Sequence, residues 1–131
     1  MAKGDDIETR LIDFAVRMIR VCETLLNTHT GQHISGQLLR SGTSPAPNYA
    51  EARGAESSKD FVHKLRIALK ELNECRVWLT IVIRAELLSE KRLNDLLDEC
   101  DQLCRILNQS IHTAKQNAKI HPFTHSSINH Y

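Results

Sequence analysis

The sequence predicts an all-α protein, an antiparallel up-down-up-down four-helix bundle with a kinked second helix. Leu, Ile, Ala, Glu, Lys and Arg dominate the composition, and these residues favour helices over sheets. Apolar residues recur at three- and four-residue steps through four long segments, which is typical of helices that bury one face. The connections between these segments are short, so neighbouring helices are expected to run antiparallel.

The first helix is expected from about Asp6 to Asn27, with Asp5 or Asp6 as its N-cap. A second set of apolar residues widens its buried face, so this helix is expected to touch more than one neighbour. The main face comprises Ile7, Leu11, Phe14, Ala15, Met18, Cys22 and Leu25, and the widening set comprises Ile12, Ile19 and Leu26.

The second helix, expected from residue 32 or 33 to residue 53, is interrupted by Gly42, Pro45 and Pro47. Proline inside a helix removes a hydrogen-bond donor and clashes with the preceding turn. In the first turn of a helix the missing N–H costs nothing, because those groups have no partner within the helix. We therefore expect Ser44 to cap a renewed helix that starts at Pro45, with a kink rather than a domain boundary.

The last two helices are expected to begin at serine caps. Ser57 or Ser58 starts the third helix, and Ser57 with Asp60 has the spacing of a capping box. The fourth helix is expected to start near Ser89, where Glu90 suits the first turn. Their apolar faces comprise Phe61, Leu65, Ala68, Leu72, Cys75, Leu79 and Val82, followed by Leu93, Leu96, Leu97, Cys100, Leu103, Cys104, Leu107, Ile111 and Ala114.

The chain is expected to form one bundle domain over residues 1–120, followed by a flexible C-terminal tail over residues 121–131, because Pro122 stops the last helix. A hydrophobic fraction of 41% is enough for a real core. No apolar run approaches the roughly 20 residues needed to cross a bilayer, and the first residues lack an apolar signal region. We therefore expect a cytoplasmic protein with no membrane partner, and a formal net charge of +1 gives it no strong general attraction to nucleic acid.

We expect no catalytic residue, no bound metal and no cofactor. Cys22, Cys75, Cys100 and Cys104 fall on apolar faces, which predicts core packing. The four-residue spacing of the last two would suit half of a zinc site, but no CxxC or HxxxH pair completes it. The seven histidines are scattered, and nothing resembles a hydrolytic triad or a phosphate-binding glycine loop.

Four polar residues lie near the apolar stripes of the second and third helices. A di-metal bundle site would require Glu-x-x-His pairs, which the sequence lacks. The alternatives are a structural network in which Arg40 or Arg76 neutralises a glutamate, and solvated surface carboxylates. We predict the structural network, comprising Asn48, Glu51, Glu71 and Glu74.

Basic residues crowd the first half of the third helix. They form either an ordinary solvated face or a surface that contacts nucleic-acid phosphates. His63 lies among them, but no aromatic platform accompanies the patch, so base stacking or sequence readout is not indicated. The possible nucleic-acid contacts are Lys59, Lys64, Arg66 and Lys70.

The run from Leu38 to Leu79 resembles one bacterial four-helix-bundle family. Its members include proteins encoded in intervening sequences of large-subunit ribosomal RNA genes and the accessory protein of diversity-generating retroelements. In that family an Asn-x-Ala-Glu segment precedes a helix with the pattern Ala-Leu-x-Glu-x-x-Glu, and residues 48–51 and 68–74 match these motifs. The match covers about residues 13–107, and departs from the family at Ala52, where many members have glycine.

The resemblance implies a non-enzymatic homopentamer around a central channel that accompanies RNA, or a reverse transcriptase and its RNA. We accordingly expect weak RNA or DNA binding, although the retroelement protein is basic and this chain is nearly neutral. The alternative is a scaffold that binds protein partners only, with no nucleic-acid role.

Overall fold

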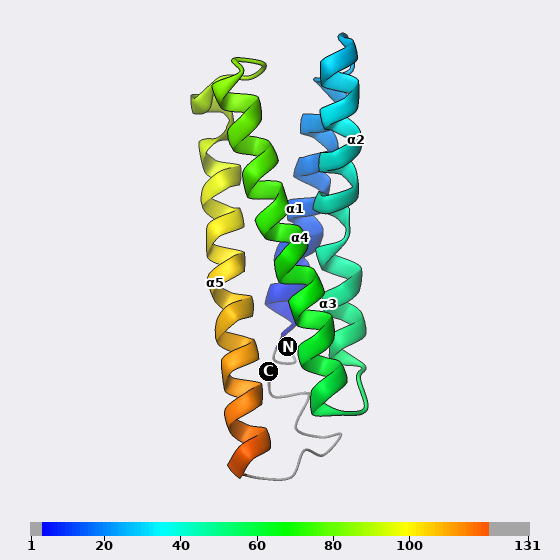
Figure 1. Ribbon diagram of the computed structural model, residues 1–131, viewed down its shortest axis with the longest axis vertical. Coiled ribbons are helices and arrows are strands. Elements are labelled where there is room, and N and C mark those ends of the chain that lie inside the picture. The colour runs from blue at the N-terminus through cyan, green and yellow to red at the C-terminus, as the bar shows by residue number, and fades with distance from the viewer. Residues whose placement is uncertain (1–3, 121–131) are drawn as a thin grey trace.

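The computed structural model describes residues 4–120, and these form a bundle with four arms, one of them bent (Figure 1). No strand occurs within this range. The predicted tail, residues 121–131, lies outside the described residues. The helices are α1 (Asp5–Glu23), α2 (His29–Thr43), α3 (Pro45–Arg53), α4 (Ser58–Arg84) and α5 (Glu90–Ile120).

Helices α1 and α4 occupy opposite corners of the bundle. Each of them packs against α2, α3 and α5. Figure 1 shows α4 in front and α1 behind, with α5 on one side and the continuous pair α2–α3 on the other. The arms alternate in direction, which confirms the predicted up-down-up-down order.

The core is built from the main apolar face that the sequence predicts for each helix. The prediction that Ile12, Ile19 and Leu26 widen the buried face of the first helix is wrong, because these side chains are exposed. Its largest fully buried side chains are aromatic or aliphatic, and burying one of them stabilises the fold by about 1.5–3 kcal/mol. All four cysteines are buried, as predicted. None of the helices within residues 4–120 combines the length and apolarity that crossing a membrane requires. The buried set includes Leu11, Phe14, Met18, Leu38, Phe61, Leu65, Leu72, Leu79, Leu93, Leu103 and Leu107.

The second arm bends where Pro45 starts α3, as predicted, but Ser44 does not cap this helix in the expected way. The backbone of Ser44 is helical, with φ −80° and ψ −36°, and its side chain accepts no capping hydrogen bond. The Asn48 N–H donates to the Ser44 carbonyl at 3.2 Å, which is the first backbone hydrogen bond of α3. The arm is therefore a bent helix rather than two separately capped ones.

The ends of α1 and α2 differ from the prediction. Gly4, at φ 100°, precedes α1, and neither Asp5 nor Asp6 caps it from outside because both belong to its first turn. Helix α1 stops at Glu23, because Thr28 caps α2 early: its hydroxyl accepts a hydrogen bond from the Gly31 N–H at 3.0 Å.

The predicted serine caps of α4 and α5 are confirmed. The Ser57 hydroxyl accepts the Asp60 N–H at 3.1 Å, and the Ser89 hydroxyl accepts the Arg92 N–H at 3.2 Å. Each cap satisfies one of the backbone donors that a helix start leaves without a partner.

The turn from α4 to α5 closes around Glu86, a non-glycine residue at φ 59°. Its N–H donates to the Ile83 carbonyl, and the next N–H, of Leu87, donates to the Val82 carbonyl, both at 3.0 Å. This pair of bonds is the Schellman arrangement, which needs a left-handed residue at the position after the helix.

Candidate nucleic-acid interface

Two of the four predicted network residues meet at Arg40, which joins α2 to α4. One guanidinium nitrogen of Arg40 donates to Glu71 at 2.8 Å, and another donates to Glu74. The Trp78 indole N–H also donates to Glu74, at 3.3 Å. The Arg40 side chain is 51% exposed, so this cluster lies at the surface of the bundle.

The other two network residues lie elsewhere. The Asn48 amide donates to the carbonyl and the hydroxyl of Ser44, both at 3.0 Å, and so stays within its own arm. The Glu51 side chain is 59% exposed and faces Lys64 of α4 at 3.7 Å. The four residues thus belong to three separate arrangements, and only Glu71 and Glu74 share a partner.

Further ion pairs connect α1 to its neighbours. Arg10 donates through two nitrogens to the carboxylate of Glu99 on α5, at 3.0 and 2.6 Å, and this hydrogen bonding raises the pKa of Arg10. Arg53 of α3 pairs with Asp5 of α1 at 2.8 Å. Among the described residues, no ion pair joins α4 to α5.

The α4–α5 seam instead holds a groove of about 990 Å³, where the start of α4 meets the second half of α5. Residues of α4 spaced by three and four form one wall, and residues of α5 with the same spacing form the other. The charged or titratable lining side chains are Lys59, His63, Arg66, His112, Lys115 and Lys119.

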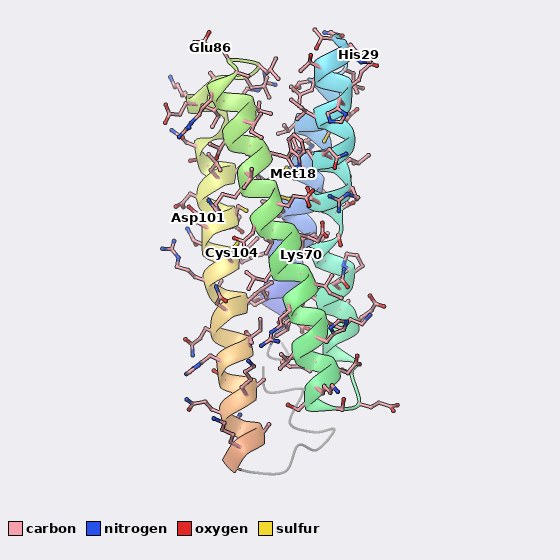
Figure 2. The ribbon with its side chains drawn as sticks, in the orientation of Figure 1. Met18, His29, Lys70, Glu86, Asp101 and Cys104 are labelled. Carbon is pink, nitrogen blue, oxygen red and sulfur yellow. The ribbon has the colours of Figure 1, made fainter. Side chains whose placement is uncertain are left out.

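Among the residues that the structure describes, no carboxylate lines this groove. Helix α5 carries none after Asp101, and Figure 2 shows Asp101 higher on α5, on the side away from α4. Four cations therefore face one another without an acidic partner in the lining, and two histidines stand among them. Such an arrangement raises the local concentration of anions even when the net charge of the chain is near zero.

The structure divides the four predicted nucleic-acid contacts. Lys59 and Arg66 line the groove, whereas Lys64 points to the other side of α4 and pairs with Glu51. Lys70 is exposed one turn beyond Arg66, outside the groove lining.

The sequence-based argument missed the α5 wall. The signal was present: His112, Lys115 and Lys119 have the three- and four-residue spacing of one helix face. Applied to α4, the same spacing places Lys59 and Arg66 on one helix face and Lys64 off it. This would have removed Lys64 from the predicted nucleic-acid contacts.

The cysteines contribute packing rather than a ligand set. Burial raises the pKa of the Cys75 thiol to about 12. A hydrogen bond between Cys100 and Cys104 and then burial raise the pKa of Cys100, and the same bond lowers the pKa of Cys104. Within the described part of the chain, no group of three or more His, Cys, Asp or Glu side chains is placed to hold a metal ion.

Comparison with known proteins identifies the family. The family described as 23S rRNA-intervening sequence protein matches residues 6–109. Among solved structures, the chain is similar to a protein of unknown function from the S23 ribosomal protein family of Bacteroides thetaiotaomicron VPI-5482. That match has 35% sequence identity and a TM-score of 0.76, and covers 80% of this chain and 97% of the other. A search of curated proteins finds no match. Both findings agree with the resemblance of the Leu38–Leu79 run, and the chain belongs to the 23S rRNA-intervening sequence protein family.

Proposed function

We propose that this protein is a non-enzymatic, self-associating interaction protein that holds the phosphate backbone of RNA in the groove between α4 and α5. One observation carries the nucleic-acid part: the described residues that line the groove include four cationic side chains and no carboxylate. The family description names 23S rRNA, which makes RNA the first ligand to consider.

Binding of this kind is weak and insensitive to base sequence. The groove offers charges for phosphates, and none of its described lining residues is a Phe, Tyr or Trp on which bases could stack. Each phosphate that a lysine or arginine neutralises releases bound counterions, so affinity falls steeply as salt rises. Screening acts over about 8 Å at physiological salt, so the local charge of the groove counts for more than the formal net charge of +1.

One wall of the groove lies outside the part of the chain that the family matches. His112, Lys115 and Lys119 follow residue 109, the last matched position. The proposed RNA contact is therefore argued for this chain. It is not argued for every member of the family.

The test is RNA binding across a salt series, measured by fluorescence anisotropy with a labelled single-stranded RNA. In the groove variant, Arg66→Glu with Lys115→Glu, one cation is reversed on each wall. The control variant, Arg20→Glu with Lys91→Glu, makes the same change in net charge at two exposed positions outside the groove.

At low salt the groove variant is expected to lose at least tenfold in affinity while the control stays within about threefold of wild type. The slope of log affinity against log salt should fall by about 1.4 for the groove variant, since each lost phosphate contact to a single strand contributes about 0.7. An equal loss in both variants, or no RNA binding by the wild type at low salt, overturns the nucleic-acid role.

A scaffold that binds only proteins is the second candidate. It is favoured by exposed aliphatic side chains on α1 and α4, which exceed what a bundle needs for its own core. The resemblance of the Leu38–Leu79 run implies a homopentamer and a protein partner such as a reverse transcriptase, so both self-association and a protein partner are part of this candidate. Light scattering at micromolar concentration tests assembly: a mass of 14.9 kDa, that of one chain, would contradict it.

A further inference from the structure

The groove between α4 and α5 holds two histidines in addition to its four cations. His63 lies on α4 with Lys59 one turn before it and Arg66 one turn after it. His112 lies on α5, one turn before Lys115. Both imidazoles are exposed, so solvent and a ligand can reach them. The binding of phosphates by lysine and arginine leaves these two side chains without a role.

Basic groups surround His63 within the groove. Lys59 and Arg66 share its wall, and α5 forms the opposite wall, while no described residue of α1, α2 or α3 lines the groove. Further along α4, Glu71 pairs with Arg40 of α2. The acidic side chains between α3 and the first turn of α4 line a different hollow, which also includes Lys64; they are Glu51, Glu56 and Asp60.

The surroundings of His112 are basic as well. Lys115 and Lys119 line the groove from the same helix, and Asp101, the nearest carboxylate on α5, is eleven residues away, about 16 Å along the helix. The Nε2 atom of His112 lies 3.2 Å from the side-chain nitrogen of Gln116. An amide side chain offers both a donor and an acceptor, so Gln116 can partner the imidazole in either protonation state.

Histidine is the side chain whose charge ordinarily changes between about pH 5 and 8, whereas lysine and arginine remain charged there. Protonation of both groove histidines raises the number of positive charges in the lining from four to six. In the free protein these like charges repel one another, and a bound phosphate chain replaces part of that repulsion with attraction. The binding of phosphate and the binding of protons therefore favour each other.

We propose that acidification strengthens the binding of RNA phosphates in this groove through protonation of His63 and His112. The inference rests on the RNA role proposed above and adds a regulation to the same site. Phosphodiesters keep their charge throughout this pH range, so the change in affinity comes from the protein. The sign follows: affinity is highest at acidic pH and falls as the histidines lose their protons.

The test uses a labelled oligouridine RNA, whose bases do not titrate between pH 5.5 and pH 8. Its affinity is measured by fluorescence anisotropy at pH 5.5, 6.5 and 8 at one fixed ionic strength. The wild type is expected to bind at least tenfold more tightly at pH 5.5 than at pH 8. The slope of log affinity against log salt should steepen by about 1.4 at pH 5.5, since each added phosphate contact to a single strand contributes about 0.7.

Two matched double variants locate the effect. The groove histidine variant, His63→Gln with His112→Gln, keeps two polar side chains that cannot become charged. It is expected to stay within about threefold of wild-type affinity at pH 8 and to lose most of the gain at pH 5.5. The control, His29→Gln with His33→Gln, changes two exposed histidines of α2 and should keep the full gain. Figure 2 shows His29 at the opposite end of the bundle from the start of α4.

All four histidines are exposed, so both variants are expected to keep the helix content of the wild type by circular dichroism. If a double variant unfolds, the single substitutions replace it, each removing about half of the change in log affinity. Titration calorimetry at pH 6.5 in two buffers of different ionisation enthalpy gives a second readout. RNA binding should take up protons in the wild type and in the control, but not in the groove histidine variant.

The outcomes separate this regulation from RNA binding itself. If the wild type binds no RNA at low salt at any of the three pH values, the RNA role fails and the regulation fails with it. If it binds equally at pH 5.5 and pH 8, the RNA role stands and the regulation is wrong. If the gain at acidic pH survives in the groove histidine variant, or disappears in the control, the regulation is assigned to the wrong side chains.

Discussion

Gly42 sets how closely α1 and α2 approach. A Cβ added there would lie 2.6 Å from Cγ and 2.8 Å from Cβ of Met18, and Figure 2 shows Met18 between the helices. Gly42→Ala is therefore expected to destabilise the protein by about 1–3 kcal/mol, since the overpacked core must shift. Urea unfolding measures this change in the free energy of unfolding.

Gly36 is the matched control on the same helix. Apart from its chain neighbours and the backbone of its own helix, no described atom lies within 4 Å of a Cβ added there, and the residue is exposed. Gly36→Ala should stabilise the protein by about 0.5–1 kcal/mol, because alanine has the higher helix propensity. Equal effects of the two substitutions would show that the Met18 contact does not limit the helix approach.

Single residues show where the sequence suffices and where it does not. Ser57 and Ser89 could be read as caps because the capping bond is local, from a side chain to a backbone three residues on. Lys64 could not be separated from Lys59 and Arg66 by composition alone, because that depends on which side of α4 faces α5. Tertiary packing decides which side of α4 faces α5, and it places Lys64 on the side that pairs with Glu51 of α3.

At the scale of elements, the α4–α5 turn carries a strained residue. Glu86 adopts φ 59°, a left-handed conformation that costs a residue with a Cβ roughly 1–2 kcal/mol and glycine almost nothing. Glu86→Gly is therefore expected to stabilise the protein by about 0.5–1 kcal/mol and to raise its Tm. Differential scanning calorimetry provides the measurement.

The neighbouring residue provides the contrast for that change. Ala85 has ordinary helical backbone angles, φ −81° and ψ 0°. Ala85→Gly only adds freedom to the unfolded chain there, so it should lower stability by about 0.5 kcal/mol. A decrease for both substitutions would mean that the Glu86 side chain contributes more than its backbone conformation costs.

Helix number and order could be predicted because each arm repeats its apolar residues with the helical period. The bend at Pro45 could be predicted from the sequence as well, because proline has no N–H to donate to the carbonyl of the preceding helical turn. The early start of α2 was not predicted, because the Thr28 cap lies in a polar stretch with no apolar pattern to mark it. The groove was beyond prediction as a unit, since its two walls are more than 40 residues apart.

For the whole molecule, assembly should make thermal stability depend on protein concentration. If folded chains associate, their Tm rises with protein concentration, because mass action favours the bound folded state. A thermal melt at 2 µM and one at 200 µM are expected to differ by several degrees for the wild type. A Tm that does not change with concentration in the wild type would argue against assembly.

The length of α5 has an evolutionary consequence. This helix continues for eleven residues past the family-matched part, which ends at residue 109, and it does so without a break. A helix end that runs beyond the matched bundle can be lengthened or shortened by whole turns while most core contacts remain. A lineage can therefore acquire or discard one cationic wall through small changes in the codons for this last stretch of α5, leaving most of the scaffold under its old constraints. Ligand preference in such a family can diversify faster than its architecture.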